Sequence, residues 1–142
     1  MDNFLTLFDV IGELARRRYQ AAERCFATLS LNHTEARLLT LLGQQGGTAT
    51  QDALSNRMFV DRSNAGRALS HLEQVGHIER RKGAGDKRTK LVQITAKGQT
   101  TVADIAKLRS KMAHSFFGDL TADEAGSIVD LLNKALRNED HA

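Results

Sequence analysis

Apolar residues recur three and four positions apart along the first 29 residues of the chain. Phe4, Phe8 and Ile11 begin this stripe, which continues as far as Leu29. Such spacing places the apolar side chains on one side of an α-helix. The pattern therefore predicts a single helix over residues 3–29, which is longer than most helices of small proteins. A stripe of this length needs a partner helix or a second subunit to cover it.

Two shorter helices are expected next, separated by a glycine-rich break. Asn32 followed by Glu35 is a capping pattern for a helix over residues 31–42. In this pattern the Asn side chain accepts from an unpaired backbone amide, and the Glu side chain reaches back to the start of the helix. Thr50 is expected to cap a third helix over residues 51–58 in a similar way.

A fourth helix and a basic hairpin follow. Asp61 is expected to cap a helix that runs to about Val75, with its apolar positions facing inward. Short strands over residues 78–81 and 90–94 are joined by a turn at residues 83–86, where glycines supply the positive φ that other residues resist. Two helices joined by a short turn and followed by a hairpin form the pattern of a winged helix-turn-helix.

The last two expected helices are again amphipathic. Thr95 opens a helix that runs to about Phe117, and Thr121 followed by Glu124 starts a sixth helix that ends near Arg137. Together with the first helix, they enclose the central segment in sequence. Three long apolar stripes are covered most simply at the interface of a two-fold dimer.

The expected fold class is therefore mainly α with a small β-wing, a winged helix-turn-helix flanked by long dimerisation helices. We expect the DNA-binding domain over residues 31–95. The helical dimerisation region is expected over residues 1–30 and 96–142.

Composition narrows the functional class. The 142 residues contain no proline and a single cysteine, so an intramolecular disulfide is excluded. Neither a signal peptide nor an apolar run of ~20 residues is evident, so we expect a cytoplasmic protein that makes no membrane contact. No phosphate-binding loop, nucleophile elbow or paired histidine spacing indicates an enzyme, a metal site or a cofactor.

The net charge of +3 is unevenly distributed. Residues 62–90 carry eight Lys and Arg against three Asp and Glu, whereas the rest of the chain carries 12 against 14. A basic segment on a nearly neutral body is typical of a surface that binds a polyanion. The alternative is a solvated basic face.

The outward face of the fourth helix carries side chains that read base edges. Arg pairs with guanine, Asn and Gln pair with adenine, and Ser contacts either. The candidate DNA-binding residues are Arg62, Ser63, Asn64, Arg67, Ser70, His71 and Gln74 on the helix, with Lys82, Asp86, Lys87, Arg88 and Lys90 on the hairpin. The alternative is an ordinary surface helix with mixed polar residues.

The hairpin strengthens the DNA-binding interpretation. Six cations lie on or near its tip, and only two acids lie near them: Arg80, Arg81, Lys82, Lys87, Arg88 and Lys90, against Glu79 and Asp86. We expect these cations to repel one another unless an anionic partner binds. A narrow minor groove attracts an inserted arginine. Asp86 is close enough in sequence to Arg88 to hold it in place for that role.

The segment from Leu31 to Gly98 resembles the MarR family of bacterial transcription regulators. The resemblance rests on the helix start L-N-x-x-E at Leu31 and on the segments TQDALSNRM, VDRSNAGRALSHLEQVGHIERR and GDKRTKLVQITAKG. The last segment matches the wing signature of the family, Asp-x-Arg followed by an apolar strand and Thr-x-x-Gly.

The resemblance implies an obligate homodimer with a triangular body and a winged helix-turn-helix in each subunit. It implies binding to a pseudo-palindromic operator, usually as a repressor, with the first, fifth and sixth helices forming the dimer. It gives Arg88, held by Asp86, the minor-groove role, and Arg67 the base-reading role. Many relatives carry Pro at the wing tip, where this chain has Gly83-Ala84-Gly85, so we expect a looser tip.

The family commonly binds small aromatic or phenolic anions between the dimer helices and the DNA-reading module. The candidates for contacting such a ligand are Arg16, Tyr19, Phe26 and His33, together with Arg17 and Arg18. In the alternative, the basic triplet is solvated or pairs with Glu13 and Glu23 across helical turns. We expect a regulator that the ligand releases from DNA.

Three other interpretations remain open. Some relatives sense peroxides through one cysteine, which suggests a redox role for Cys25, although its place on the apolar stripe favours inert packing. A sequence-tolerant architectural protein would bind DNA without any ligand. A protein-interaction module that has lost DNA binding is the third, and the residue types at Asp86, Arg88 and Arg67 argue against it.

Overall fold

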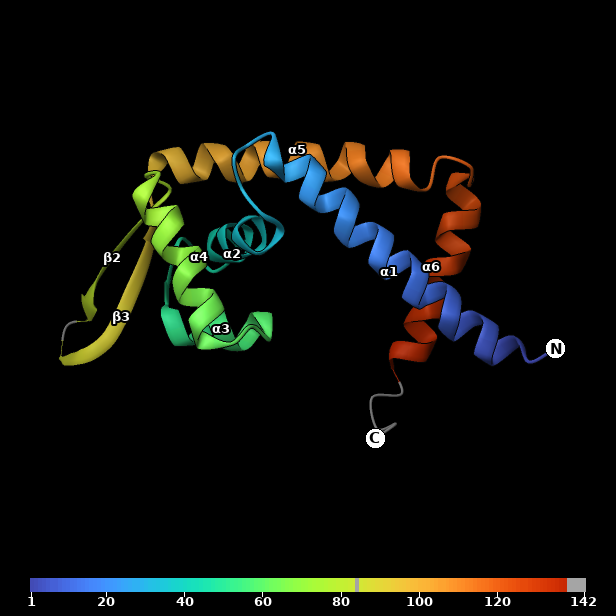
Figure 1. Cartoon of the computed structure of the whole chain (residues 1–142), viewed down its shortest axis with the longest axis horizontal. Coiled ribbons are helices and arrows are strands. Elements are labelled where there is room, and N and C mark those ends of the chain that lie inside the picture. The colour runs from blue at the N-terminus through green and yellow to red at the C-terminus, as the bar shows by residue number, and fades with distance from the viewer. Residues whose placement is uncertain (84, 138–142) are drawn as a thin grey trace. The chain divides into compact units, whose positions relative to one another are not determined.

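The computed structural model describes residues 1–83 and 85–137, and for Asp86, Lys87 and Arg88 it describes the backbone alone. In chain order the elements are α1 (Asn3–Ala27), α2 (His33–Gln44), β1 (Thr48–Thr50), α3 (Gln51–Met58), α4 (Arg62–Gln74), β2 (Ile78–Gly83), β3 (Asp86–Ile94), α5 (Ala96–Phe116) and α6 (Ala122–Leu136) (Figure 1). Contacts divide the chain into two compact units, residues 1–112 and 113–142. The expected fold class, mainly α with a small β-wing, is confirmed.

Local capping patterns set the starts of the helices, as predicted. Asn32 Oδ1 accepts from the Glu35 amide and Glu35 Oε1 accepts from the Asn32 amide, both at 2.8 Å. The carboxylate of Asp61 caps α4, and Thr121 forms a second reciprocal box with Glu124 at the start of α6. The predicted long first helix is also confirmed, and it ends at Ala27 where a short turn begins. In the described part of the chain, no helix is long and apolar enough to cross a membrane.

The core of the first unit lies between α2, α3, α4 and the hairpin. Its buried side chains come from every one of these elements and include Leu38, Leu39 and Leu42 of α2, Leu54 and Met58 of α3, Leu69 and Leu72 of α4, and Ile78 and Val92 of the strands. Phe26 of α1 and Ile105 of α5 complete it. Within α3, Ala53 is exposed, whereas Ser55 is buried.

The two helices at the ends of the chain keep large apolar side chains in solvent. In α1, Phe4 is 85% exposed and Phe8 is 77% exposed. In α6, which belongs to the second unit, Val129 and Leu131 are exposed and no residue is buried. These faces are amphipathic, as the sequence predicts, but the single chain does not cover them.

The strands β2 and β3 form an antiparallel hairpin that is longer than predicted. Their register pairs Ile78 with Ile94 and Arg80 with Val92. The strand β1 was not predicted; it pairs Ala49 with Val92 and gives the sheet the order β1-β3-β2. Three residues are too few for an alternating pattern to be visible in the sequence, because such a strand is defined by its partner.

The start of α5 is fastened to the root of the hairpin. Thr95 donates its amide to the His77 carbonyl at 3.0 Å and its hydroxyl to the Gly76 carbonyl at 2.6 Å. The same hydroxyl accepts from the Gly98 amide at 3.1 Å. A Cβ atom on Gly98 would lie 2.2 Å from the His77 carbonyl oxygen, so a larger residue does not fit without a backbone shift. The Thr-x-x-Gly of the wing signature is therefore a structural joint.

Candidate nucleic-acid interface

The outward side of α4 and the adjoining side of the hairpin border one shallow surface, which we call the reading groove. It is lined by Gln51, Arg62, Ser63, Gly66, Arg67, Ser70, His71, Gln74, Arg80 and Lys90. The fold thus brings most of the helix candidates together with Lys90 of β3. Asn64 faces a smaller hollow on another side of α4, beside Thr34 and Glu35. Lys82 is exposed on β2 and does not line the groove.

The first turn of α4 orients two of the predicted DNA-binding residues. The Asp61 carboxylate accepts from the Asn64 amide at 2.7 Å and from its side-chain nitrogen at 2.9 Å. The side-chain oxygen of Asn64 then accepts from the Arg67 guanidinium. This chain of contacts restrains the side chain of Arg67, which lowers the side-chain entropy that any binding partner would have to remove.

Arg80 does not fit the prediction of an unpartnered cation on the hairpin. Its Nε and Nη2 atoms donate to Glu73 Oε1 of α4 at 3.2 and 3.1 Å, and its Nη2 also donates to Ser70 Oγ at 3.0 Å. Glu79 and Asp86 are the acids nearest the hairpin in sequence, but the turn after α4 brings Glu73 against β2. Arg80 therefore joins the wing to the recognition helix.

His71 is tied to the helix behind α4. Its Nδ1 atom contacts Glu35 Oε2, and the side chain of Glu35 is only 6% exposed. Because the other oxygen of Glu35 caps α2, one carboxylate connects the start of α2 to α4. His71 still borders the reading groove, and its part in DNA binding stays a prediction.

His77 is a buried histidine at the root of the hairpin, next to this cluster. Burial lowers the pKa of His77, and the charges of Lys97 and His71 lower it further, while Glu35 acts in the opposite direction. Its Nδ1 atom has no hydrogen-bond partner among the described residues.

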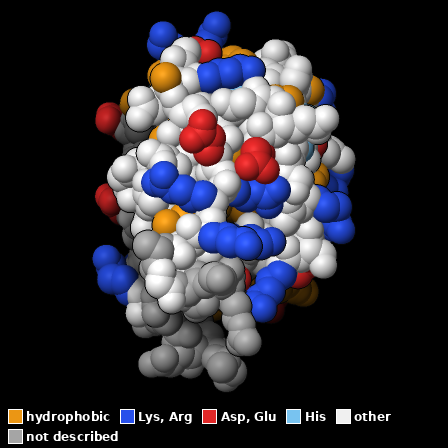
Figure 2. Space-filling model, turned by 90° about the vertical axis from the view of Figure 1, so that its left-hand side faces the viewer, with side chains coloured by type: hydrophobic (Ala, Val, Ile, Leu, Met, Phe, Trp, Pro, Cys, Tyr) orange, Lys and Arg blue, Asp and Glu red, His pale blue; other side chains and the backbone are white. Residues whose placement is uncertain are grey.

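The wing is basic where its side chains are described. Lys82 pairs with Lys90 across the hairpin, and Gly85 adopts a left-handed φ of 100° in the turn. Figure 2 views the end of the molecule that carries the wing, and there Lys and Arg side chains are spread over the surface with a few acids between them. The side chains of Asp86, Lys87 and Arg88, with their predicted pairing, lie outside the described residues.

A separate cavity of about 280 Å³ lies in the first unit, between α1 and α5 on one side and α2 and α3 on the other. Four arginines line it, one from each helix: Arg18, Arg37, Arg57 and Arg109. Its other lining residues include Phe26, His33, Thr40, Met58, Ile105 and Met112. Among the described residues that line this cavity, none is Asp or Glu.

Three of the six predicted ligand-binding residues, Arg18, Phe26 and His33, line the cavity. Tyr19 stands behind His33, with ring centroids 5.4 Å apart. Burial lowers the pKa of His33, and the charges of Arg37 and Arg18 add to this effect. The imidazole is therefore held toward its neutral form.

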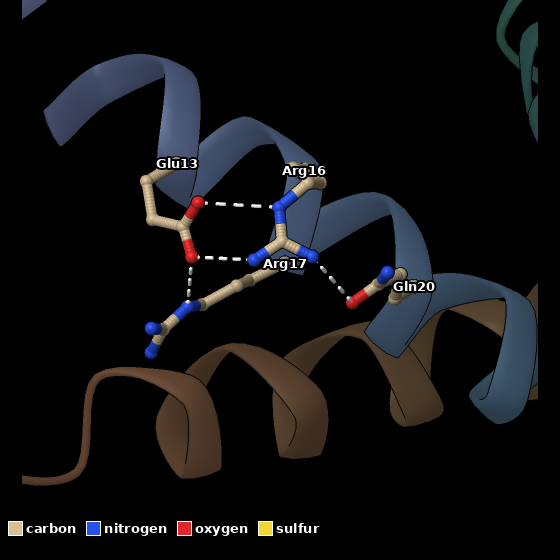
Figure 3. A network of polar contacts seen from close by, with 4 residues as sticks. All are labelled: Glu13, Arg16, Arg17 and Gln20. Carbon is tan, nitrogen blue, oxygen red and sulfur yellow. Dashed lines mark hydrogen bonds and ion pairs between the residues drawn. The ribbon is translucent and has the colours of Figure 1, made fainter. Parts of the chain in front are cut away.

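A further predicted residue, Arg16, does not line the cavity. It donates to both oxygens of Glu13 at 3.1 and 2.5 Å and approaches Gln20 at 3.4 Å, while Arg17 donates to the same Glu13 at 2.8 Å (Figure 3). These contacts within α1 lower the pKa of Glu13 to about 2. The alternative of pairing across helical turns is thus observed for Glu13. Glu23 instead accepts from the His33 amide at 2.9 Å.

Sequence reasoning missed Arg37, Arg57 and Arg109. Each lies on the exposed side of its own helix, where a charged residue needs no special explanation. Their common feature is that four helices converge on one cavity, and helical periodicity does not carry that information.

The remaining candidates are less informative. Cys25 is half-buried against α5, with Sγ 3.9 Å from the Leu108 carbonyl oxygen. Within the residues that the structure describes, no group of three or more His, Cys, Asp or Glu side chains is arranged to hold a metal ion.

Comparisons with known proteins agree on one family. The model of the MarR family matches residues 31–90. The transcriptional repressor MprA of Escherichia coli is 28% identical over 103 residues, which are 72% of this chain and 58% of MprA. The apo form of wild-type MarR from Escherichia coli has the same fold, with a TM-score of 0.82 at 24% identity over 92% of this chain and 96% of that one.

A MarR mutant from Escherichia coli complexed with operator DNA also has this fold, with a TM-score of 0.78 at 23% identity over 94% of this chain and 96% of that one. The family model covers the helix pair and most of the wing, including the reading groove, and the structural matches extend over the flanking helices. The relatives are transcription regulators, in agreement with the expectation that the protein is not an enzyme. By these comparisons, the chain is similar to the MarR family over residues 31–90.

Proposed function

We propose that the protein is a homodimeric repressor that binds a pseudo-palindromic operator and is released by a small anionic molecule. In this proposal α4 enters the major groove and the wing reaches the adjacent minor groove. The observation that carries the proposal is the reading groove, in which base-reading side chains of α4 and cations of the hairpin share one surface. That a MarR of the same fold has been crystallised with operator DNA supports it.

The uncovered apolar faces support a dimer. The exposed Phe4 and Phe8 of α1 and Val129 and Leu131 of α6 would be buried by a second subunit. We assign dimerisation to residues 1–30 and 96–142, with DNA binding in between. Two-fold symmetry would then set the two recognition helices roughly 34–36 Å apart, one turn of DNA.

The cavity is the proposed ligand site. Its walls come from α1 and α5 on one side and from α2 and α3 of the reading module on the other. A ligand that fits better when the reading module is turned away from its DNA-binding position would lower the affinity for DNA. The size of this effect equals the difference in its affinity for the two arrangements.

The test is to measure DNA binding of Arg67→Ala by fluorescence anisotropy, on duplexes from the region upstream of the protein's own gene. Arg67 borders the groove and is oriented by Asn64. We expect the free energy of binding to the specific site to weaken by about 1–3 kcal/mol. We also expect the variant to discriminate little among bases at the one base pair that Arg67 reads. Arg16→Ala is the control, because it removes the same charge from a position outside the groove.

Two outcomes would contradict this assignment. Wild-type affinity and specificity in Arg67→Ala would exclude α4 as the reading element. A specific to non-specific affinity ratio near one for the wild-type protein, at fixed salt, would instead establish a sequence-tolerant architectural binder.

A further inference from the structure

The positive charge of the four arginines around the cavity restricts the class of ligand that it can bind. We infer that its ligand is a compact molecule with at least two negative charges on an apolar body, in preference to a neutral phenol or a simple monocarboxylate. This inference rests on the proposed function for the place of the ligand in regulation. It rests on the lining residues alone for the chemistry.

The arginines that line the cavity have no acidic partner among the described side chains. In the described part of the chain, no carboxylate forms an ion pair with Arg18, Arg37, Arg57 or Arg109. In the empty cavity these exposed side chains are screened by water. A ligand that fills the cavity displaces this water. The negative charges of the ligand must then replace the screening that the water gave to the arginines. One carboxylate is matched by one bidentate guanidinium, which would leave most of the positive charge uncompensated.

Two residues that line the cavity carry buried polar atoms without a partner in the described part of the chain. The Nδ1 atom of His33 and the Oγ1 atom of Thr40 are both buried, and neither has a hydrogen-bond partner among the described residues. Both residues line the cavity. Buried polar groups are almost always satisfied, and a ligand with several acidic oxygens offers acceptors for both.

The apolar side chains of the cavity indicate the body of the ligand. Phe26, Met58, Ile105 and Met112 make part of the cavity wall apolar. The His33 ring is itself packed near Phe26, with centroids 6.2 Å apart. A purely polar anion would leave this surface without contacts, so the acidic groups are expected on an apolar frame such as a ring.

The position of the arginines indicates how such a ligand acts. Arg57 lies near the end of α3, just before the turn that leads into α4, whereas Arg18 and Arg109 lie on α1 and α5. A ligand with separate acidic groups can pair with Arg57 of α3 and, at the same time, with Arg18 of α1 or Arg109 of α5. His33 begins α2 two residues before Glu35, which contacts His71 of α4. The cavity is therefore connected to α4 in two ways, through the end of α3 and through the start of α2.

The experiment is isothermal titration calorimetry on the purified full chain, at constant ionic strength, with probes that share a benzene ring. The probes are phenol, benzoate, isophthalate and phenyl phosphate, which carry none, one, two and two charges near neutral pH. We expect both dianions to bind about tenfold more tightly than benzoate, and phenol to bind most weakly. The two dianions distinguish charges on separate groups from charges on one group.

Variants locate the binding. Arg57→Gln and Arg109→Gln are each expected to weaken the binding of isophthalate about tenfold and to leave phenol unchanged. Arg57→Lys, which keeps the charge, is expected to lose less. Arg16→Gln is the matched control, because Arg16 is held by Glu13 outside the cavity. Thermal melts of each variant show whether it is folded before the titrations are compared.

The outcomes separate this inference from the proposed function. Equal affinity for benzoate and isophthalate, or no heat from any carboxylate or phosphate at millimolar concentration, would overturn the inference. Isophthalate binding that depends on Arg57 and Arg109 but leaves DNA affinity unchanged would uphold the inference and reject ligand release. If the protein fails to bind DNA at all, the titrations still decide the charge of the ligand.

Discussion

The reading groove and the cavity are both rich in arginine, but the rest of the chain engages these arginines differently. In the groove, Arg80 is bound to Glu73, and Arg67 donates to Asn64. Arg62 lies 3.7 Å from Asp52. In the cavity, the described residues provide no carboxylate to any of the four arginines.

The difference follows from the size of the partner that each surface is proposed to bind. DNA presents phosphates over a wide area, and its sequence is read by a few side chains held in the right place. Internal hydrogen bonds supply that order before binding. A small anion has to neutralise nearly all of the charge around it, so carboxylates from the protein would compete with it. Binding in the groove thus depends on how its side chains are positioned, whereas binding in the cavity depends on its net positive charge.

Gly98→Ala tests the joint on which the geometry of the groove depends, and we expect the largest effect from it. The added Cβ would lie 2.2 Å from the His77 carbonyl oxygen and 2.7 Å from Ile94, so the hairpin root or α5 has to move. We expect the free energy of unfolding to fall by about 3 kcal/mol, measured by urea titration.

Gly66→Ala is the matched control for this change, because it lies inside α4 and its Cβ would have ordinary contacts, the nearest at 3.7 Å. There the helix propensity of alanine is expected to raise stability by about 0.5–1 kcal/mol. If Gly98→Ala unfolds at the wild-type urea concentration, the joint is not rigid and the wing is not positioned through it.

Glu73→Gln tests whether the ion pair with Arg80 orders the groove. The change removes the charge-assisted bonds of Arg80, so stability is expected to fall by about 1 kcal/mol. It also leaves Arg80 free to contact phosphates anywhere along DNA. We expect non-specific affinity to rise and the specific to non-specific ratio to fall, measured by anisotropy with operator and scrambled duplexes at one salt concentration.

Glu79→Gln is the matched control, because it removes the same charge from β2, next to Arg80 in the chain. Glu79 is exposed and forms no ion pair within the residues that the structure describes. The loss of this charge should therefore raise specific and non-specific affinity by a similar factor and leave their ratio unchanged. If both variants behave alike, charge alone matters in the groove and the proposed contrast with the cavity is lost.

The parts of this fold that depend on neighbouring residues could be predicted from the sequence. The capping boxes at Asn32 and Thr121 join positions three apart, and they set the starts of α2 and α6 as expected. The strand β1 could not be predicted in this way, because its three residues are recognised only by their pairing with Leu91–Gln93.

In the candidate site, too, contacts between residues that are distant in sequence could not be predicted. Helical periodicity identified the outward face of α4, because a single helix carries that whole face. It did not identify the ion pair between Glu73 and Arg80, which crosses the turn between a helix and a strand. Nor did it identify Arg57 and Arg109, which reach the cavity from helices about 50 positions apart. A site made of several elements depends on packing, and packing is not periodic.

The smallest expected effect is the dependence of the free energy of unfolding on pH. Each of the two regions contributes to it through one histidine. His33 lines the cavity, and His77 lies at the root of the hairpin; burial lowers the pKa of both. The unfolded chain therefore binds more protons than the folded chain at pH values just below 6.5, the ordinary pKa of histidine. Stability is complete above that pH and falls as the pH decreases toward the lowered folded pKa values. Urea titrations between roughly pH 5 and 7 measure this slope.

A bound dianion should change the slope for one histidine only. Arg37, Arg18 and Arg109 lower the pKa of His33, and Glu23 opposes them. Negative charge in the cavity offsets the arginines, so saturating isophthalate should flatten the pH dependence of wild-type stability. His33→Gln removes this titration and should show the flatter profile without ligand, with no further flattening when isophthalate is added. The acid sensitivity that His77 contributes should persist in both cases, because His77 does not line the cavity. If isophthalate flattens the profile of His33→Gln as much as that of the wild type, the ligand acts on a group outside the cavity, and the charge contrast between the two regions is wrong.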